Sequence, residues 1–550
     1  MDSINSNDKI RIDKLLDEVE QAKAPVDLDQ RRYERTTTSS SASLLVKSGL
    51  FGKSIPVRVH NASPSGLGLE LPKDVALPIN EKVDVLWLVP PLLHQGSAPK
   101  PSRLRGTIVR LGTSSQHSFQ CGVRFDGLLQ EQLTHEEGRK SRILTAILAG
   151  LLAILICVLK SRNVISFWYQ PLLQIYSLAA ALYVLSRAGL AVLYREPKDA
   201  GYLAAISVVI AVKNEEKVIA STVKHCFEAR YPQDLLEVLV VDDGSTDGTW
   251  KVLQELQAQY SNLKVFQFEQ NKGKRHAMAL GATKAKGAIV IFIDSDSLVE
   301  PEGFYRIIQP FASKRVGAVA GHTLVIIEED NFISKMEAVR YYVSQRIMKA
   351  AEGVFGVVGC CPGPFSAYRR DAVMVALPAW LGQTFLGTAA TFGDDRSLTN
   401  FILKTHDVVY HAGARCSTYV PRKWETFFRQ QLRWKKSWIR ETTIAARFMY
   451  TKHPFAVLAY YGSVVITVVS PLVAVRAILF LPLTGGGVSY APYLLGLLLV
   501  YGFFGLLYYY FTREDHWYYG MAFALIYVAV LSFQNYYALV TVNRNHWGTR

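Results

Sequence analysis

Two blocks of apolar residues, 142–194 and 453–542, constrain the fold of this chain more than any other feature. Each block contains long apolar runs, and about 20 consecutive residues of this kind are enough to cross a bilayer as a helix. Residues 200–450 between them have the sequence pattern of a soluble α/β domain, and the first 140 residues are polar. The sequence therefore predicts a multi-domain membrane protein, with α-helical transmembrane segments on both sides of a soluble domain.

The apolar blocks also bear on the number of crossings. The first block holds two candidate helices, 143–160 and 172–194, and the second holds three apolar stretches, 454–483, 490–511 and 516–542. Three crossings in the second block would place the terminal sequence "NRNHWGTR" outside, although its two arginines favour the cytoplasmic side. A split of one stretch around Pro471, or a re-entrant segment, would give the even number that a cytoplasmic tail requires.

The net charge of +15 at pH 7 suits either a nucleic-acid-binding protein or a membrane protein. We expect no nucleic acid polymer as a partner, because Lys and Arg gather on the cytoplasmic side of membrane segments for a simpler reason. The start of the chain lacks the apolar core of a signal peptide, so we expect a cytoplasmic N-terminus. Basic amphipathic helices are expected in the membrane interface at Phe332–Ala351 and Trp424–Phe448. The six cysteines have no paired metal spacing and predict reduced thiols.

Residues 38–130 contain short β-like pieces separated by turn residues. The pieces are "SASLLVKS", "SIPVRVHNAS", "GLGLELP", "KVDVLWLV", "SRLRGTIVRL" and "SFQCGVRFDG". Several short strands at this spacing predict a small β-barrel.

Pairs of aspartates occur at three places in the α/β region: Asp242 and Asp243 in "VVDDGSTDGT", Asp294 and Asp296 in "IFIDSDSLVE", and Asp394 and Asp395 in "FGDDRSLTN". The first two pairs end apolar strands of a βαβ pattern, and ligands of open α/β sheets bind outside the carboxyl ends of strands. An Asp-x-Asp at such an end can hold Mg²⁺ or Mn²⁺ against a diphosphate, because hard cations prefer carboxylate oxygens. Each pair alone could be a strand-end turn, but three pairs in one domain favour a binding site.

Cationic and aromatic residues accompany these pairs. "NKGKRHAM" places Lys272, Lys274 and Arg275 between a strand and a helix, where cations suit phosphate contacts. "QQLRW", residues 430–434, supplies an Arg that can grip a diphosphate and a Trp face that can stack on a sugar ring. Alone, the first stretch would be a solvated helix N-terminus and the second an interfacial helix.

Together these motifs resemble the processive family 2 glycosyltransferases of the GT-A fold, and among them the hyaluronan synthases. The matching stretches are "VDDGS", "NKGKRHA", "DSD", "AGH", "CPGPFSAYRR", "QTFLG", "GDDRSLTN", "QQLRW" followed by "KKSWIRE", and the terminal "WGTR". The resemblance runs from residue 200 to 450 and resumes at the tail. One departure is "IAVKNEE", which places Lys213 where relatives often carry a Tyr, so the identity of the donor stays open.

The resemblance implies a role for each of these residues. Asp395 would be the general base that takes the proton from the acceptor hydroxyl, and repulsion from Asp394 would favour that proton uptake. Asp294 and Asp296 would anchor Mg²⁺ or Mn²⁺ together with the nucleotide. The donor, a UDP-sugar by this resemblance, and the acceptor sugar would be bound by Asp242, Asp243, Lys272, Lys274, Arg275, Cys361, Gln430, Arg433 and Trp434.

The same resemblance gives the tail and the apolar blocks a role. Trp547 and Arg550 would belong to a gating loop that closes over the bound nucleotide. A growing polysaccharide is too polar to cross lipid unaided, so it needs a path between helices. Arg187 and Arg476 lie inside apolar segments, where ionisable residues usually face the protein interior or a wet path. We expect them to line or flank the polymer route, with snorkelling to the interface as the alternative.

The front of the chain resembles a PilZ domain, whose two short motifs bind cyclic di-GMP. "RRYER" precedes the predicted barrel and "NASPSG" lies inside it. The resemblance implies a cyclic di-GMP site made of Arg31, Arg32, Arg35, Asn61, Ser63 and Gly66. Arginine suits phosphates and guanine faces alike, because its guanidinium is planar, always charged and able to stack. The alternative is a basic linker beside a β-turn.

The combined prediction is a bacterial inner-membrane enzyme that polymerises an exopolysaccharide on the cytosolic side, secretes it through its own helices and is activated by cyclic di-GMP. Its expected parts are a charged segment (1–30), a PilZ-like barrel (31–135), two transmembrane helices (142–194), a GT-A domain (200–450), C-terminal transmembrane helices (453–542) and a cytoplasmic tail (543–550). The resemblance favours a hyaluronan-like product, while mannuronan, a cellulose-like glucan and a GlcNAc homopolymer stay open. The alternatives from other classes are a catalytically inactive cyclic di-GMP receptor and a pure transporter, which the acidic motifs disfavour.

Overall fold

The structure is a computed structural model, and it describes residues 36–46, 53–63, 66–71, 82–89, 100–113, 119–125, 142–158, 171–328, 331–476, 480, 483 and 491–543. The chain divides into two compact units, Met1–Ile143 and Leu144–Arg550.

The first unit contains a closed barrel of six strands in the order β1-β2-β3-β6-β5-β4, which confirms the predicted small β-barrel. The strands are β1 Thr36–Val46, β2 Lys53–Ser63, β3 Gly66–Leu71, β4 Lys82–Val89, β5 Lys100–Thr113 and β6 Phe119–Phe125. Alternation places Val57 and Val59 inside and Arg58 outside. The inward side chains, among them Leu104 and Cys121, fill the barrel, as expected for a barrel of this size.

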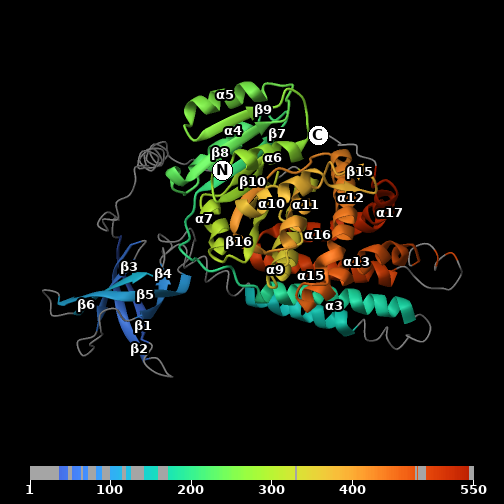
Figure 1. The fold of residues 1–550 in the computed structure, drawn as a ribbon. Helices are drawn as coiled ribbons and strands as arrows, with labels where there is room; N and C mark the ends of the chain where they lie inside the picture. Colours follow the sequence, from blue (N-terminus) through green and yellow to red (C-terminus); the bar gives the residue numbers. More distant parts are fainter. Residues whose placement is uncertain are drawn as a thin grey trace, which may run out of the picture. The chain divides into compact units, whose positions relative to one another are not determined.

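The second unit is built on an eight-stranded sheet with the order β11-β16-β12-β13-β10-β7-β8-β9 (Figure 1). Its strands are β7 Ile206–Val212, β8 Leu236–Asp242, β9 Leu263–Gln267, β10 Ile289–Asp294, β11 Ser297–Val299, β12 Val316–Val325, β13 Ser366–Arg369 and β16 Asp407–Thr418. Strands β10, β7, β8 and β9 are parallel, whereas β13 is antiparallel to both β10 and β12. Because β8 and β10 both flank β7 in parallel, their final residues, Asp242 and Asp294, lie at the same edge of the sheet.

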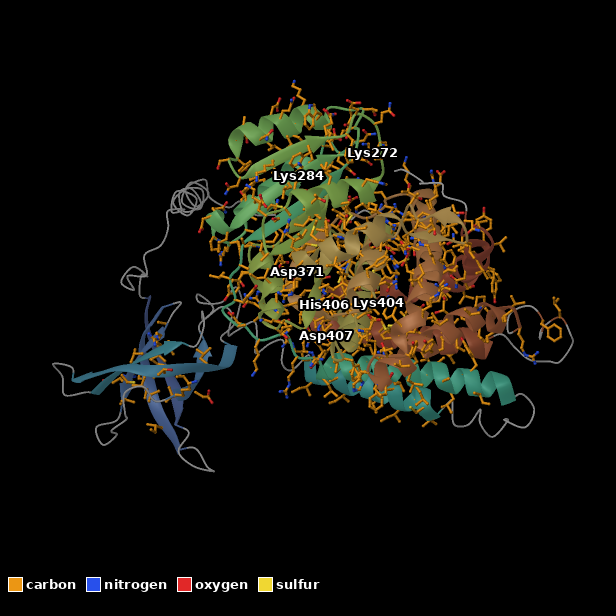
Figure 2. The ribbon with its side chains drawn as sticks, viewed as in Figure 1. Lys272, Lys284, Asp371, Lys404, His406 and Asp407 are labelled. Carbon is orange, nitrogen blue, oxygen red and sulfur yellow. The ribbon has the colours of Figure 1, made fainter. Side chains whose placement is uncertain are left out.

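Helices cover both faces of this sheet (Figure 1). They are α4 Ile219–Glu228, η3 Gln233–Leu235, α5 Thr249–Gln259, α6 Lys274–Lys284, α7 Gly303–Ile308, η4 Gln309–Ala312, α8 Phe332–Tyr342, the π-helix η5 Val343–Lys349, α9 Ala350–Gly353, α10 Arg370–Leu381, α11 Asp394–Leu403 and α12 Trp424–Met449. Core residues of α4, α5 and α7 pack with one face, and those of α6, α10 and α11 pack with the other. Helices α6 and α11 therefore share a face; Figure 2 labels Lys284, the last residue of α6, and Lys272, two residues before its start.

A short hairpin precedes α11, formed by β14 Thr384–Phe385 and β15 Thr388–Ala389. The two predicted amphipathic segments are helical, since the first is α8 followed by η5 and the second is α12.

Four helices are long and apolar enough to cross a membrane, namely Ile175–Leu193, Pro454–Val475, Leu495–Thr512 and Asp515–Val540. They correspond to α3 Pro171–Leu193, α13 Pro454–Val475, α15 Ala491–Thr512 and the run of η7 Asp515–Tyr518, α16 Tyr519–Ile526, η8 Tyr527–Leu531 and α17 Ser532–Val540. The other predicted crossing forms a shorter apolar helix, Arg142–Val158. Helix α13 continues through Pro471, so this proline does not split the described part of the segment into two helices.

Candidate active site

The first aspartate pair stands at the end of β8, and both carboxylates are buried and hydrogen-bonded. Asp242 is fully buried, and its carboxylate accepts hydrogen bonds from the backbone N–H of Ser245 (3.0 Å) and from Nε2 of Gln267 (3.0 Å). These bonds fix the turn after the strand. The carboxylate of Asp243 instead contacts a separate loop, residues 272–273.

Asp243 holds the loop that leads into α6. Its carboxylate accepts hydrogen bonds from the backbone N–H groups of Lys272 (2.7 Å) and Gly273 (3.0 Å). Burial raises the pKa of Asp243, although these donors oppose the shift. The loop can come this close because Gly244, with φ of 67°, has no side chain; a Cβ there would lie 2.8 Å from the backbone nitrogen of Asn271.

The second pair follows β10. Asp294 forms an ion pair with the ammonium of Lys274, and its Oδ2 would lie 3.0 Å from a Cβ on Gly363. Asp296 is 5% exposed and accepts a hydrogen bond from Oγ1 of Thr418 (3.4 Å). The glycine of "CPGPF" therefore allows the backbone to pass close to the carboxylate that ends β10.

The donor atoms of Asp294 and Asp296 suit a hard divalent cation. Within the described ranges, no group of three His, Cys, Asp or Glu side chains lies close enough together to hold a metal ion. Asp294 and Asp296 would each supply carboxylate oxygens, and phosphate oxygens and water would supply other ligands. This is the usual way in which Mg²⁺ is bound together with a nucleotide.

The third pair opens α11. Gly393 precedes the helix with φ of 73°, and Asp394 and Asp395 are its first two residues. Asp394 is 5% exposed and forms an ion pair with Nε of Arg275 at 2.6 Å. Asp395 is less buried, and its Oδ2 lies 3.7 Å from Sγ of Cys360. The two neighbouring carboxylates therefore have different surroundings.

Two of the predicted contact residues have buried side chains. A phosphate contact was expected of Arg275, but its Nη1 donates to the carbonyl oxygen of Trp380 (3.0 Å) and to Oε1 of Gln383 (3.1 Å), and the side chain is 4% exposed. A sugar contact was expected of Cys361, but this residue is fully buried and its N–H donates to Oγ1 of Thr399. Its neighbour Cys360, which sequence reasoning missed, is the cysteine next to Asp395.

Lys272, in the loop before α6, and Lys274, the first residue of α6, differ in exposure. Lys272 is exposed, with its ammonium 4.8 Å from the ring centroid of Phe268, so it is accessible to a ligand. Lys274 is drawn inward by its partner Asp294. Burial lowers the pKa of Lys274, but the nearby aspartates outweigh this effect and raise it overall.

Helix α12 carries the three residues of "QQLRW" that sequence analysis singled out, Gln430, Arg433 and Trp434. Oε1 of Gln430 is buried and has no hydrogen-bond partner among the described residues. The ring of Trp434 lies 6.1 Å from that of Tyr341, and the guanidinium of Arg340 lies 5.0 Å from the Trp434 ring centroid. Burial raises the pKa of Tyr341, and Asp294 and Asp296 are among the carboxylates that add to this shift. Trp434 therefore packs beside Tyr341 and Arg340.

The two arginines of the apolar segments have different environments. Arg187 on α3 is 5% exposed, with its guanidinium 5.5 Å from the ring centroid of Tyr183 and with no hydrogen-bond partner for Nε within the described part of the chain. Arg476 follows α13 and lies 5.7 Å from the ring centroid of Phe480. Arg187 is therefore a buried cation within a helix long enough to cross a membrane.

Several predicted residues fall outside the described ranges: Arg31, Arg32, Arg35, Trp547 and Arg550. Of the other PilZ motif, Asn61 and Ser63 end β2 and Gly66 begins β3, with Ser63 paired to Gly66 across the hairpin. The described chain ends at Asn543, which lines a small pocket together with Phe385 of the β14–β15 hairpin.

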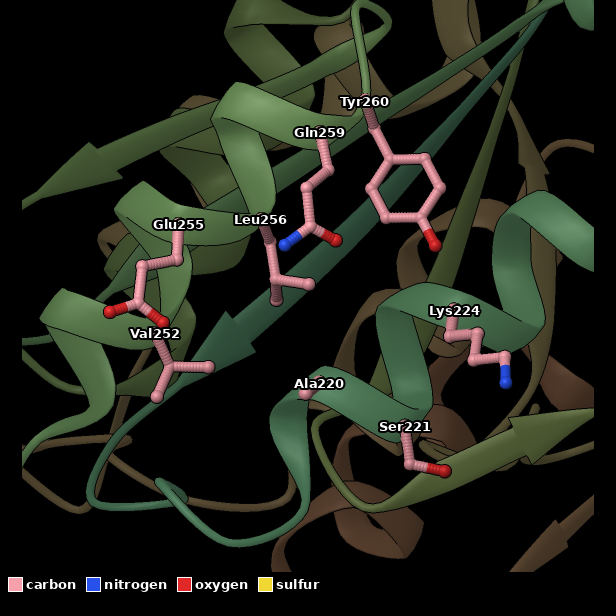
Figure 3. A pocket seen from close by; sticks show the side chains of 8 residues that line it. All are labelled: Ala220, Ser221, Lys224, Val252, Glu255, Leu256, Gln259 and Tyr260. Atoms are coloured by element: carbon pink, nitrogen blue, oxygen red, sulfur yellow. The ribbon is translucent and has the colours of Figure 1, made fainter.

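A surface groove of about 400 Å³ lies between α4 and α5 (Figure 3). It is lined by polar and apolar side chains, among them Lys224, Glu255 and Tyr260. None of its lining residues belongs to the aspartate motifs, so the candidate active site is defined by the contacts between those motifs and not by this groove.

Comparison with family models gives two matches. Residues 207–375 match the model for glycosyl transferase family 2, and residues 29–137 match the model for the PilZ domain. The first match contains two of the aspartate pairs, and the second contains the barrel.

Related proteins extend the first match. A hyaluronan synthase of Streptococcus pyogenes is 27% identical over 382 residues, covering 68% of this chain and 90% of the relative. An N-acetylglucosaminyltransferase of Rhizobium meliloti is 32% identical over 292 residues, covering 52% of this chain and 68% of the relative. Among solved structures, the mannosyltransferase PcManGT of Pyrobaculum calidifontis aligns with 70% of this chain and 99% of its own, at 20% identity and a TM-score of 0.47.

Proposed function

Because this chain belongs to glycosyltransferase family 2 and carries a PilZ domain, we propose that it polymerises an exopolysaccharide from nucleotide sugars and responds to cyclic di-GMP. The observation that carries the proposal is the meeting of all three aspartate motifs at the first turn of α6 and the loop before it. Carboxylates from distant parts of a chain repel one another, so they gather where a cation or a cationic ligand complex is to be bound.

The donor side of the site is formed by the first two motifs. Asp242 and Asp243 would lie beside the base and phosphates of the nucleotide, with the exposed Lys272 as a phosphate contact. Asp294 and Asp296 would hold Mg²⁺ or Mn²⁺, which supplies charge neutralisation for the departing diphosphate. Lys274, already paired with Asp294, adds a second cation at the same place.

The acceptor side is formed by the third motif. Asp395 would take the proton of the acceptor hydroxyl while that oxygen attacks the anomeric carbon and the bond from this carbon to the diphosphate oxygen breaks. Asp395 is the more exposed aspartate of its pair, as a base that must reach a substrate requires. Asp394 would not touch the substrate, because its carboxylate is bound to Arg275.

Helix α12 would complete the site. Gln430 and Arg433 are proposed to bind the diphosphate, to which the side-chain amide N–H groups of Gln430 and the guanidinium of Arg433 can donate. The buried Oε1 of Gln430 has no hydrogen-bond partner among the described residues and can accept only from a donor, such as a sugar hydroxyl. Trp434 would stack on the acceptor sugar. The tail with Trp547 and Arg550 would close over the nucleotide, a role supported by the position of Asn543 beside the hairpin that precedes α11.

The apolar helices are proposed to carry the polymer across the bacterial inner membrane, with the catalytic and PilZ domains in the cytoplasm. The buried cation Arg187 supports a polar path between α3 and its neighbours, because an unpaired charge facing lipid would be strongly unfavourable.

Regulation is proposed to act through the PilZ domain. Asn61, Ser63 and Gly66 lie at one hairpin, and the arginines of "RRYER" would complete a cyclic di-GMP site around it. Activation requires that the dinucleotide bind the active conformation better than the inactive one. Polymer synthesis should therefore rise on addition of cyclic di-GMP, and an Arg35→Ala variant should lose this response; equal rates with and without saturating dinucleotide would reject the regulation.

The product is proposed to be hyaluronan-like, from UDP-GlcNAc and UDP-GlcA, by analogy with the streptococcal relative. A GlcNAc homopolymer is the second candidate, because the rhizobial relative is named an N-acetylglucosaminyltransferase. Mannuronan and a cellulose-like glucan are the other candidates. Purified enzyme should be offered each nucleotide sugar singly and in pairs, with the composition of the polymer read out.

The catalytic assignment has its own test. Asp395→Asn keeps the size of the side chain but removes the base, so polymer synthesis should fall to background. Full polymer yield from this variant would overturn the assignment, and absence of turnover by the unaltered enzyme with every nucleotide sugar and cyclic di-GMP would favour an inactive receptor.

A further inference from the structure

The first turn of α6 and the loop before it contact one carboxylate of each acidic motif. The contacts are those of the backbone N–H groups of residues 272–273 with Asp243, of Lys274 with Asp294, and of Arg275 with Asp394. Four consecutive positions, 272–275, thus connect the donor side of the site to its acceptor side. Arg275 makes the last of these contacts, across 119 residues of sequence.

Arg275 is buried, and its hydrogen bonds are directed into the protein. Nε binds Asp394, while Nη1 binds both the carbonyl oxygen of Trp380 and the side chain of Gln383. The guanidinium also lies 5.3 Å from the ring centroid of Trp380. Only Nη2 has no hydrogen-bond partner within the described ranges, and it is buried too. This geometry is that of a bridge between α6, α10 and α11.

The bridge continues into α12 through a buried hydrogen-bond network. Gln383 accepts a hydrogen bond from Oγ of Ser397 (2.6 Å) and donates to the carboxylate of Glu441 (3.0 Å). Glu441 also accepts from Nδ2 of Asn400 (3.1 Å) and from Nε of Arg440 (2.8 Å). The network therefore holds α11 against α12, the helix that carries "QQLRW", at Ser397 in its first turn and at Asn400 one turn later.

We propose that Arg275 is a positioning residue: through Asp394 it sets where the first turn of α11 lies, and thereby where Asp395 meets the acceptor. The inference rests on the proposed function, since it assumes that Asp395 is the base. It differs from the phosphate contact that the position of Arg275 in "NKGKRHA" suggested. A displacement of about 1 Å at a reacting group can lower the rate about a hundredfold, so a residue that sets this position can have a large effect without touching substrate.

The two hypotheses, a phosphate contact and a positioning role for Arg275, predict different kinetic changes. A phosphate contact acts on donor binding, so its loss raises the KM for the nucleotide sugar. A positioning residue acts on the geometry of the chemical step, so its loss lowers kcat while the donor KM stays within about twofold. Removal of Arg275 also leaves Asp394 as a buried unpaired carboxylate, and this defect is removed if Asp394 is made neutral as well.

The experiment measures release of the nucleoside diphosphate by purified full-length enzyme with Arg275→Gln, Asp394→Asn and the double variant. We expect kcat of each single variant to fall about tenfold or more, and kcat of the double variant to exceed that of Arg275→Gln, because a neutral Gln–Asn pair can bridge the same helices. Arg275→Lys, which keeps the charge and loses the planar fork, replaces Arg275→Gln if the latter does not fold, and it should show the same separation of kcat from KM.

Arg369→Gln is the matched control, because Arg369 also holds its surroundings by bonds to backbone carbonyl oxygens but lies at the far end of β13. It should leave the kcat and KM of the folded fraction unchanged. A raised donor KM with unchanged kcat in Arg275→Gln, or a double variant no better than that single variant, would overturn the proposal. Asp395→Asn separates this failure from failure of the proposed function, since it tests the base and not the bridge.

Discussion

Replacing Gly393 by alanine should be among the most damaging single-methyl additions in the catalytic domain. Gly393 has φ of 73° and ψ of 40°, the left-handed region that L-residues enter at a penalty of about 1–2 kcal/mol. A Cβ on this residue would also lie 1.8 Å from Oγ and 2.6 Å from Cβ of Ser437 on α12. Overpacking of this kind destabilises by about 1–3 kcal/mol, so the combined loss of stability should be about 2–5 kcal/mol.

Because the added Cβ collides with the side chain of Ser437, a second substitution at Ser437 should restore part of the lost stability. In Gly393→Ala combined with Ser437→Gly, no Ser437 side chain is left to collide, and the remaining loss is the left-handed penalty with about 1 kcal/mol for glycine inside α12. With Ser437→Ala the hydroxyl is gone, but the 2.6 Å contact to Cβ persists, so this double variant should recover less. The order of stability is therefore wild type, then the glycine rescue, then the alanine rescue, then Gly393→Ala alone.

Denaturant unfolding in detergent, followed by tryptophan fluorescence, and sugar transfer by the folded fraction would test this order. Activity should fall with stability, because Gly393 immediately precedes the aspartate pair of α11. Wild-type stability in Gly393→Ala would refute the reasoning, because it would show that the left-handed conformation carries no penalty. Equal stability of the two double variants would also refute it, because it would show that the contact with Cβ of Ser437 has no effect.

Three further predictions follow from particular contacts. Burial, aided by Arg340, lowers the pKa of Lys435 from 10.5 to about 8. The unfolded chain therefore binds more protons than the folded protein between these pH values, so the free energy of unfolding should rise from about pH 8 to about pH 10.5. Unfolding measurements on Lys435→Met should lack this rise. Arg187→Leu should reduce the polymer released outside cells, and unchanged release would reject a place for Arg187 on the polymer route. Gly244→Ala should raise the KM for the nucleotide sugar, because its Cβ would push the loop at Asn271 off Asp243; an unchanged KM would argue against a role of that loop in donor binding.

The elements of the fold could be predicted from the sequence where burial is periodic. Alternating residues gave the six barrel strands, and continuous apolar runs gave β7, β8 and β10 with aspartates at their ends. Hydropathy also located the long apolar helices. It predicted a crossing at 143–160 as well, where the described helix Arg142–Val158 is shorter than the other four.

The partners of the site residues could not be predicted in the same way. Periodicity reports that a side chain is buried, but not against what, and the partner of Arg275 is 119 positions away. The choice between Cys360 and Cys361 has a similar cause, because the two residues are adjacent and identical, and only the fold shows that Cys360 lies beside Asp395. The signal that could have helped was burial itself, since an arginine followed by the apolar positions of α6 lies on the inner face of that helix.

The adjacency of Asp394 and Asp395 has a physical explanation that the sequence alone did not supply. Like-charge repulsion was expected to make one of them accept a proton, but successive residues of a helix point about 100° apart, so two aspartates in a first turn need not share surroundings. Asp394 faces Arg275, which neutralises it, while Asp395 faces the side of Cys360. The N-terminus of α11 further stabilises negative charge at both positions. Asp394 thus anchors the helix and leaves Asp395 to reach the acceptor. This division of roles predicts that polymer synthesis survives Asp394→Asn far better, when Arg275 is replaced as well, than it survives Asp395→Asn in any background.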